Sequence, residues 1–304
     1  MITQSENISL RDGLIALSVV ALWGLHVVVI RIGALEIPPL LLLSIRFAIV
    51  TAVAAFFFTK LPKEKIKNIA IYTVFYLVLH LGTIFVGLKY ISASTGGLIL
   101  QTEVPFAILL GWLLLGEKFG LKTMLGLLLA FAGVLIIIYQ PGGAQIEGFT
   151  YLGAFLLLAS SFFWAVGAIR MRNIEGIDFW TMTFYSHIIA LPFVIGLTAI
   201  FENDHWNAVM NANHLTLGIV LFYQVVLMTI CLYTWKNLMV RNRAYQVTVF
   251  MLLQPIFSVV FGAIILGESL GVKTLIGGGV ALLGVVVVTM RKMQKAQKME
   301  IPGE

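Results

Sequence analysis

The residues of this sequence that could bind a polar molecule lie near the middle of long apolar stretches. They combine aromatic rings, imidazoles, one carboxyl group and one amide, and they are Trp23, His26, Tyr76, His80, Glu103, Trp164, Tyr223 and Gln254. A charged side chain at the centre of a bilayer costs about 2.5 to 3.5 kcal/mol on insertion scales, so it needs a partner, water or a function. Aromatic walls with a few polar groups are typical of small-molecule sites. We therefore predict that these residues form a substrate-binding cluster.

The ionisable members of the cluster each allow two interpretations. A carboxyl group at the depth of Glu103 could carry a proton or meet an ammonium group, and we favour this functional interpretation over a structural one. For His26 and His80, a hydrogen bond to a neighbouring helix is as reasonable as contact with a substrate. The sequence has no His, Asp or Glu spacing typical of a metal site and no clustered acidic pair. No metal, cofactor or catalytic residue is therefore predicted.

Two prolines lie inside stretches that otherwise have the character of helices. Pro105 and Pro255 each leave an earlier carbonyl, that of Gln101 or Met251, without its helical hydrogen bond. In a membrane such a carbonyl has to face protein, water or a substrate. We predict that both prolines break helices that line the binding site, and the alternative is a simple packing kink.

Other charged residues lie nearer the ends of apolar stretches. Arg46 is expected about eight residues inside its stretch, where it could extend to the membrane surface or pair with Glu36, and we favour such a structural role over a functional one. Glu117 and Glu268 are expected to end helices and to form ion pairs that fix the adjacent turns.

The composition requires a membrane environment. Hydrophobic residues make up 60% of the chain and charged residues 11%, whereas a soluble domain has roughly 45 to 50% and 25%. A helix of about 20 apolar residues crosses a hydrocarbon core of about 30 Å. Ten stretches have this length, at approximately 13–33, 38–59, 68–88, 93–115, 122–140, 151–171, 178–201, 215–238, 244–266 and 273–290. The predicted fold class is all-α integral membrane, with ten transmembrane helices.

The positive charge is distributed as membrane topology requires. With ten spans, both termini and the even-numbered connections share one side, and that side carries most of the 20 lysine and arginine residues. The exceptions are Arg31, Lys89 and Lys273 on the other side and Arg46 within a span. The positive-inside rule therefore places both termini in the cytoplasm. Because topology explains the net charge of +6, no nucleic-acid partner is predicted.

One segment of the chain occurs twice. Residues 115–134 match residues 266–285 without a gap, and the ten identities include a Leu-Gly-Glu turn and several glycines. Far more positions agree than a shared apolar composition would give, so the chain contains a duplicated unit. The repeated glycines, such as Gly126, Gly133 and Gly284, predict close packing between helices.

The duplication extends to the start of each half. Trp23 and Arg31 of the first span match Trp164 and Arg172 of the sixth span, although more weakly. Five spans per half is an odd number, so the second half enters the membrane from the opposite side, as in secondary transporters with inverted repeats. The predicted units are residues 1–140 and residues 141–304, the second with a short basic tail.

These features resemble those of the drug/metabolite transporter superfamily, EamA type. The similar residues are Trp23-Gly24, Arg46-Phe47, the prolines of spans four and nine, and Leu-Gly-Glu before a Gly-rich span in each half. The stretch from Arg11 to Phe47 is also similar to bacterial exporters of amino-acid metabolites such as O-acetylserine and cysteine. The resemblance implies an inner-membrane carrier with a central cavity formed mainly by spans one, three, four, six, eight and nine. Four-span multidrug members of the superfamily rely on a glutamate in span one, whereas this span offers only His26, so the resemblance does not imply proton coupling by that route. It also assigns no role to Glu103.

Residues and resemblance together predict a carrier that exports amino acids or related small metabolites by alternating access. Efflux of drugs or other organic cations is the alternative, because one acidic residue among aromatic rings suits a cation equally well. An enzyme is not predicted. The expected partners are a small-molecule substrate and the lipid bilayer, and a monomer is compatible with the sequence.

Overall fold

A computed structural model describes residues 8–139 and 151–300, with side chains up to residue 290. These residues form helices and no β-strand. The first half contains α1 (Leu10–Glu36), α2 (Pro39–Ala54), α3 (Lys63–Thr73), η1 (Val74–His80), α4 (Leu81–Tyr90), α5 (Ala93–Ile99), η2 (Leu100–Thr102), α6 (Glu103–Leu115) and α7 (Leu121–Ile138). The second half contains α8 (Tyr151–Met171), α9 (Phe179–Phe201), α10 (His205–Asn211), α11 (His214–Phe222), η3 (Tyr223–Leu227), α12 (Met228–Arg241), α13 (Ala244–Thr248), η4 (Val249–Leu253), α14 (Gln254–Leu266) and α15 (Val272–Glu300).

The ten predicted spans are confirmed as helices. Nine helical stretches of the described chain are long and apolar enough to cross a membrane, and α2 is a shorter apolar helix. The predicted end of α2 at residue 59 is wrong, because the helix stops at Ala54 after 16 residues and is only about 24 Å long. The predicted boundary between the two units, at residues 140 and 141, lies outside the described residues.

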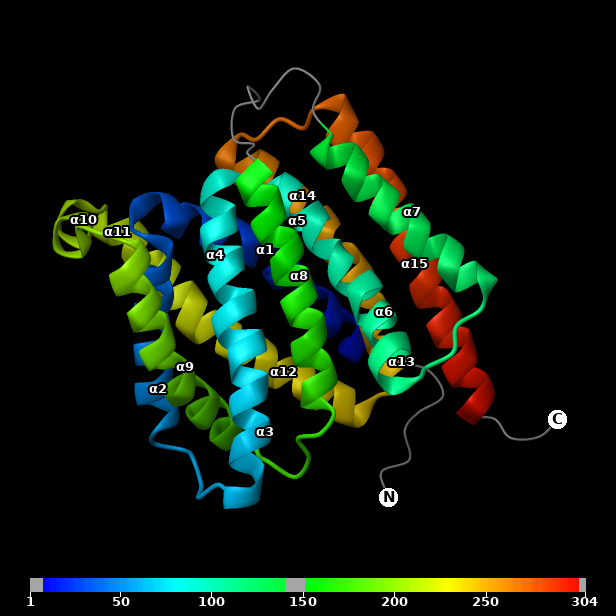
Figure 1. Ribbon diagram of the computed structural model, residues 1–304, viewed down its shortest axis with the longest axis horizontal. Helices are drawn as coiled ribbons and strands as arrows, with labels where there is room; N and C mark the ends of the chain where they lie inside the picture. The colour runs from blue at the N-terminus through cyan, green and yellow to red at the C-terminus, as the bar shows by residue number, and fades with distance from the viewer. Residues whose placement is uncertain (1–7, 140–150, 301–304) are drawn as a thin grey trace.

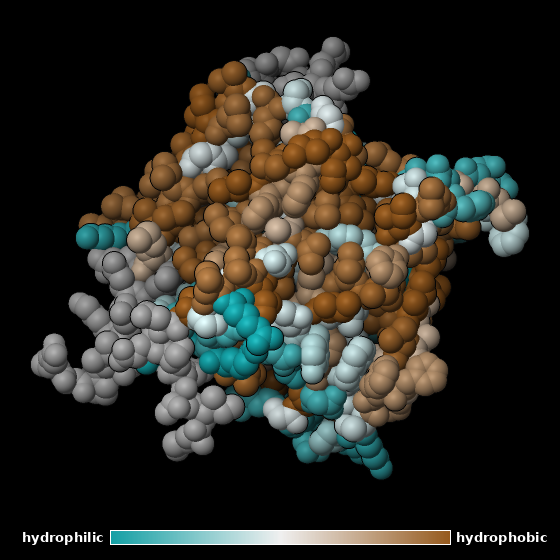
Figure 2. Space-filling view, turned by 180° about the vertical axis from the view of Figure 1, so that it is seen from behind, coloured by the Kyte–Doolittle hydropathy of each residue, from teal (hydrophilic) through white to brown (hydrophobic). Residues whose placement is uncertain are grey.

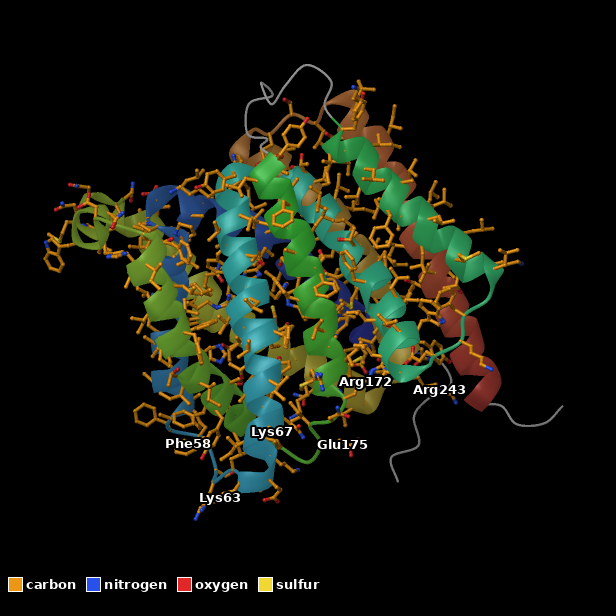
Figure 3. All side chains as sticks on the ribbon, viewed as in Figure 1. Phe58, Lys63, Lys67, Arg172, Glu175 and Arg243 are labelled. Carbon is orange, nitrogen blue, oxygen red and sulfur yellow. The ribbon has the colours of Figure 1, made fainter. Side chains whose placement is uncertain are left out.

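The helices run side by side, and the start of α1 and the end of α15 lie toward the same end of the bundle (Figure 1). We call this end, drawn at the bottom of Figure 1, the termini side, and the other end the opposite side. Lys63, Lys67, Arg172, Glu175 and Arg243 all lie on the termini side (Figure 3). Between the ends, apolar side chains cover most of the visible face, as a bilayer requires (Figure 2).

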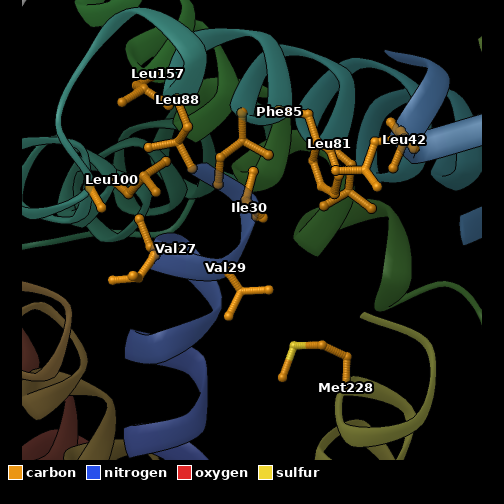
Figure 4. Packing of buried hydrophobic residues seen from close by; sticks show 14 of the residues in the cluster. Val27, Val29, Ile30, Leu42, Leu81, Phe85, Leu88, Leu100, Leu157 and Met228 are labelled. Atoms are coloured by element: carbon orange, nitrogen blue, oxygen red, sulfur yellow. The ribbon is translucent and has the colours of Figure 1, made fainter. Parts of the chain in front are cut away.

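Apolar side chains of both halves fill the interior of the bundle. Ile30 of α1 and Phe85 and Leu88 of α4 are completely buried, and Leu157 of α8 packs beside them (Figure 4). Complete burial of large side chains from three helices fixes the positions of α1, α4 and α8. Polar groups on these helices are thereby held in a constant arrangement.

The repeated glycines bring α7 and α15 into close contact at the edge of the bundle (Figure 1). A Cβ atom on Gly133 would lie 2.2 Å from the backbone nitrogen of Ala281, and one on Gly284 would lie 2.3 Å from that of Ala130. The same residue types serve both helices, because the two segments are copies of each other. The predicted close packing is confirmed, and only glycine permits this distance between the backbones.

Replacing Gly133 by alanine is expected to separate α7 from α15. The added methyl group meets backbone atoms that cannot rotate away, so the free energy of unfolding should fall by about 1 to 3 kcal/mol. Gly279→Ala is the matched control, since nothing lies within 4 Å of a Cβ atom at that position. Thermal unfolding in detergent should show a lower Tm for Gly133→Ala and an equal or higher Tm for Gly279→Ala. Equal Tm values would contradict the packing.

Candidate functional site

Four spans that carry predicted site residues are interrupted near their centres. The third and eighth spans contain the π-helical segments η1 and η3, and the fourth and ninth contain the 3-10 segments η2 and η4. The third span is equivalent to the eighth, and the fourth to the ninth, so the irregularities follow the duplication. π-helical turns are rare and frequently occur at functional sites.

Most of the predicted residues lie within or directly after these segments. Tyr76 and His80 belong to η1 and Tyr223 begins η3, while Glu103 and Gln254 are the first residues of α6 and α14. The remaining three, Trp23, His26 and Trp164, lie on the continuous helices α1 and α8.

Each predicted helix-breaking proline follows a 3-10 segment. Pro105 has no N–H for the carbonyl of Gln101, which lies in η2, and Pro255 has none for Met251, which lies in η4. Within η2, the Thr102 hydroxyl donates to the carbonyl of Ile99 over 2.8 Å. The helix thus tightens just before each proline, and both 3-10 segments lie near mid-span.

His26 connects α1 to the π-helical segment η3. Its Nε2 donates to Oε1 of Gln224 over 2.7 Å, and its ring is stacked with that of Tyr223 at a centroid distance of 6.3 Å. The Tyr223 hydroxyl donates to the carbonyl of Leu22 over 2.5 Å. Sequence reasoning missed Gln224, because an α-helix would place consecutive residues on different faces, whereas both contact α1 here.

His80 connects the π-helical segment η1 to α8. Its Nδ1 donates to the Ser160 carbonyl over 3.1 Å, and the Ser160 hydroxyl donates to the His80 carbonyl over 3.0 Å. The Tyr76 ring packs between Tyr72 and His80, with centroid distances of 5.1 and 5.3 Å. The Trp164 side chain interacts with Tyr76, and α8 packs closely on Tyr76, where a Cβ atom on Gly167 would lie 2.9 Å from the Tyr76 Cβ atom. Tyr76, His80 and Trp164 therefore form one cluster.

Glu103 lies near this cluster. Its carboxyl group interacts electrostatically with Tyr76 and forms no ion pair with a described lysine or arginine. Glu103, Tyr76 and His26 are only half-buried although they lie deep in the bundle. Residues that line a solvent-accessible interior have this property.

Two predicted residues lie slightly apart. The Trp23 ring packs against Trp235 at a centroid distance of 4.7 Å. Gln254 contributes its backbone to a close approach of α14 to α1, where a Cβ atom on Gly24 would lie 2.8 Å from the Gln254 carbonyl oxygen. Within the described chain, neither side chain hydrogen-bonds to another member of the predicted cluster.

Arg46 lies at the centre of the protein, and the expectation that it extends to the surface or pairs with Glu36 is wrong. Its side chain is only 6% exposed, and its guanidinium carbon lies 6.0 Å from the centre of the Phe85 ring. Glu36 instead accepts a hydrogen bond from the backbone of Asn213 over 3.1 Å. Because α2 is shorter than predicted, its eighth residue lies at mid-helix.

The predicted turn-fixing ion pairs cross between the two halves. Arg31 of the first half pairs with Glu268 of the second over 3.3 Å and donates to the carbonyls of Leu88, over 2.9 Å, and Ile91. Glu268 also accepts hydrogen bonds from the first backbone N–H groups of α5, at Ala93 over 2.7 Å and at Ser94 over 2.8 Å. The Arg31–Glu268 pair therefore supplies hydrogen-bond partners for backbone carbonyl groups at the end of α4 and backbone N–H groups at the start of α5.

The equivalent pair on the termini side has a different environment. Arg172 of the second half donates to Glu117 of the first over 2.7 Å. The side chains of Arg31 and Glu268 are 14% and 10% exposed, but those of Arg172 and Glu117 are 51% and 41% exposed. Two pairs related by the duplication are thus buried at one end and exposed at the other.

Helix packing is also closer on the opposite side than on the termini side. On the opposite side α5 packs closely on α14, where a Cβ atom on Gly97 would lie 2.0 Å from the Ser258 hydroxyl and one on Gly262 would lie 2.2 Å from the Ser94 hydroxyl. The equivalent elements on the termini side, α13 and α6, do not form this close packing. The described part of the bundle is therefore tightly closed at one end only.

The fold and the central polar residues define a class of protein. Ten membrane helices in two related halves, with interrupted helices meeting at mid-depth, are the architecture of a membrane transporter. The comparison with family models gives the same class: residues 12–139 and 151–290 each match the EamA-like transporter family. The chain belongs to this family.

Several relatives align with nearly the whole chain. A protein of Salmonella typhimurium named "Probable amino-acid metabolite efflux pump" is 30% identical, over 92% of this chain and 95% of its own length. A protein of Escherichia coli with the same name is 29% identical over the same shares of the two chains. An uncharacterized transporter of Bacillus subtilis is 26% identical over 95% of this chain and 94% of its own length. A solved crystal structure with 18% identity has a TM-score of 0.61 and covers 93% of this chain and 98% of its own, which supports the fold.

Removing the charge of Glu268 is expected to loosen the start of α5. In Glu268→Gln the backbone N–H groups of Ala93 and Ser94 lose charge-assisted hydrogen bonds, so their hydrogen exchange should accelerate about tenfold or more. Exchange measured by mass spectrometry over residues 91–97 tests this. Glu117→Gln is the matched control, because it removes the equivalent carboxylate at the other end and should leave this segment unchanged. Equal exchange in Glu268→Gln and the unmodified protein would contradict the assigned contacts.

Proposed function

We propose that this protein exports amino acids or related small metabolites across the bacterial inner membrane, by alternating access to a site at mid-depth. The substrate-contacting residues are Trp23, His26, Tyr76, His80, Glu103, Trp164, Tyr223 and Gln254, with helix breaks at Pro105 and Pro255. The names of the Salmonella and Escherichia relatives support the substrate class.

The observation that best supports alternating access is the structural difference between the two ends of the bundle. The Arg31–Glu268 pair is buried and α5 is packed on α14, whereas the Arg172–Glu117 pair is half exposed. The duplication repeats the Arg–Glu pair, so each end of the bundle holds charged groups that can join the two halves. If one end of the bundle closes when the other opens, the centre is exposed to one side of the membrane at a time.

The charge distribution supports an orientation for this cycle. Lys63, Lys67, Arg172 and Arg243 all lie on the termini side, so the positive-inside rule makes that side cytoplasmic (Figure 3). The closed end is then the external one, and the described conformation would receive solutes from the cytoplasm. An exporter loads its solute in this conformation.

The chemistry of the centre supports a solute that is small and partly charged. Tyr76, Trp164 and Tyr223 supply aromatic surface, while Arg46 and Glu103 supply charge of both signs. Aromatic rings with a few oriented polar groups suit a small metabolite.

Transport by the purified protein in liposomes tests the substrate class. Labelled O-acetylserine, cysteine and aromatic amino acids should move faster across these membranes than across protein-free ones. A resistance screen in a drug-sensitised strain should show no protection against organic cations. Absence of transport for every amino-acid-like solute, together with drug resistance, would contradict the proposal and favour drug efflux.

Glu103→Gln is expected to reduce transport at least about tenfold and to remove its pH dependence. The amide keeps the size of the side chain, but it can neither release a proton nor attract an ammonium group. Glu175→Gln is the matched control, because Glu175 is exposed on the termini side. Transport and a pH profile that stay unchanged in Glu103→Gln would show that this carboxyl group has no part in the cycle.

A further inference from the structure

Arg46 is a buried cation that lacks a protein anion. Its side chain is 6% exposed, and neither Nε nor NH1 has a hydrogen-bond partner in the part of the chain that the structure describes. No described aspartate or glutamate lies within ion-pair distance, since the pairs found involve Arg31, Arg172 and Arg241. Several N–H donors of Arg46 are therefore available inside the protein.

The groups facing Arg46 do not supply the missing charge. Arg46 interacts electrostatically with His26, His80 and His187, and each of these imidazoles already hydrogen-bonds to an uncharged group. The Phe85 ring offers only its face, at 6.0 Å. Among the residues that the structure describes, the surroundings of Arg46 thus contain three imidazoles and aromatic rings, and no carboxylate within ion-pair distance.

A buried guanidinium in this state is costly for the fold. A buried ion is tolerated when it is paired or hydrogen-bonded, and a polar group within a membrane protein marks a pathway or a binding site. Guanidinium groups recognise carboxylates through charge-assisted hydrogen bonds. The donors of Arg46 therefore fit an anion that comes from outside the chain.

A second charged group defines which anion fits. Tyr76 interacts electrostatically with both Arg46 and Glu103, so a cation and a carboxyl group share its neighbourhood. The two charged groups do not form an ion pair with each other. A solute with a carboxylate at one end and an ammonium group at the other matches both, whereas the carboxyl group of Glu103 would repel a solute that is only anionic.

We propose that Arg46 binds the carboxylate of the transported solute, while Glu103 receives its ammonium group beside Tyr76. This inference rests on the proposed function and specifies its substrate as a zwitterionic α-amino acid. Arg46 is then the residue that distinguishes amino acids from amines, which lack the carboxylate.

Binding to the purified full-length chain tests the proposal. L-cysteine and L-phenylalanine are each compared with their methyl esters, which lack the carboxylate, and with their N-acetyl derivatives, which lack the ammonium group. In Arg46→Gln the amino acids should bind about 10- to 100-fold more weakly, and their preference over the methyl esters should disappear. Glu103→Gln should instead remove the preference over the N-acetyl derivatives. Arg170→Gln is the matched control, since it removes an equal charge from an exposed position.

Stability without solute separates a binding role from a structural one. Removing an unpaired buried charge should leave the Tm of Arg46→Gln equal or raise it, whereas a structural arginine would lower the Tm. Arg46→Lys serves as a second variant that keeps the charge, and it should retain part of the preference for the carboxylate. The proposal would be overturned if both variants had a lower Tm and both still preferred the amino acids to their methyl esters.

The binding results separate the role of Arg46 from the proposed substrate class. If the unmodified protein binds none of the amino acids, the proposed substrate class is wrong and the role of Arg46 falls with it. If the unmodified protein prefers amino acids to their methyl esters and Arg46→Gln keeps that preference, only the role of Arg46 is wrong.

Discussion

The structure depends on how backbone polar groups are satisfied where membrane helices begin, end or break. Hydrocarbon supplies no hydrogen bonds, so an irregular segment is stable only where protein or enclosed water surrounds it. Arg31 and Glu268 meet this requirement at the junction of α4 and α5, where they bind carbonyl and N–H groups of two helix ends. The π-helical and 3-10 segments meet it by facing the centre of the bundle. Polar side chains near these segments are therefore concentrated at mid-depth.

The duplication makes this arrangement available twice. An Arg–Glu pair that joins the two halves exists at each end of the bundle, but one pair is buried and the other is half exposed. The glycines between α7 and α15 come from the same repeated segment and hold these supporting helices together. The molecule thus combines a closely packed support with a repeated ion pair whose environment differs between the two ends, and the proposed alternating access rests on this difference.

Much of this could be predicted from the sequence, because membrane spans are long apolar stretches and a duplication is visible as repeated letters. The ten spans, the glycine packing and the participation of Glu117 and Glu268 in ion pairs were predictable in this way, whereas their partners in the other half, Arg172 and Arg31, were not. The position of Arg46 was not, because apolarity continues past Ala54 and conceals where α2 ends. Gln224 was missed since a π-helical turn changes which residues share a face, and no local residue pattern marks such a turn. The predicted substrate-contacting residues remain a prediction that only binding and transport can test.

Distances between spin labels at the two ends test the central claim most directly, in a background whose one cysteine is replaced by serine. One label pair occupies the exposed positions Lys89 and Ser269 on the opposite side, and the other occupies Lys118 and Ala244 on the termini side. In lipid, Glu268→Gln should lengthen the first distance and shorten the second, because release of one closed end permits closure of the other. Lengthening of the first distance without any shortening of the second would show that the ends open independently and would contradict alternating access.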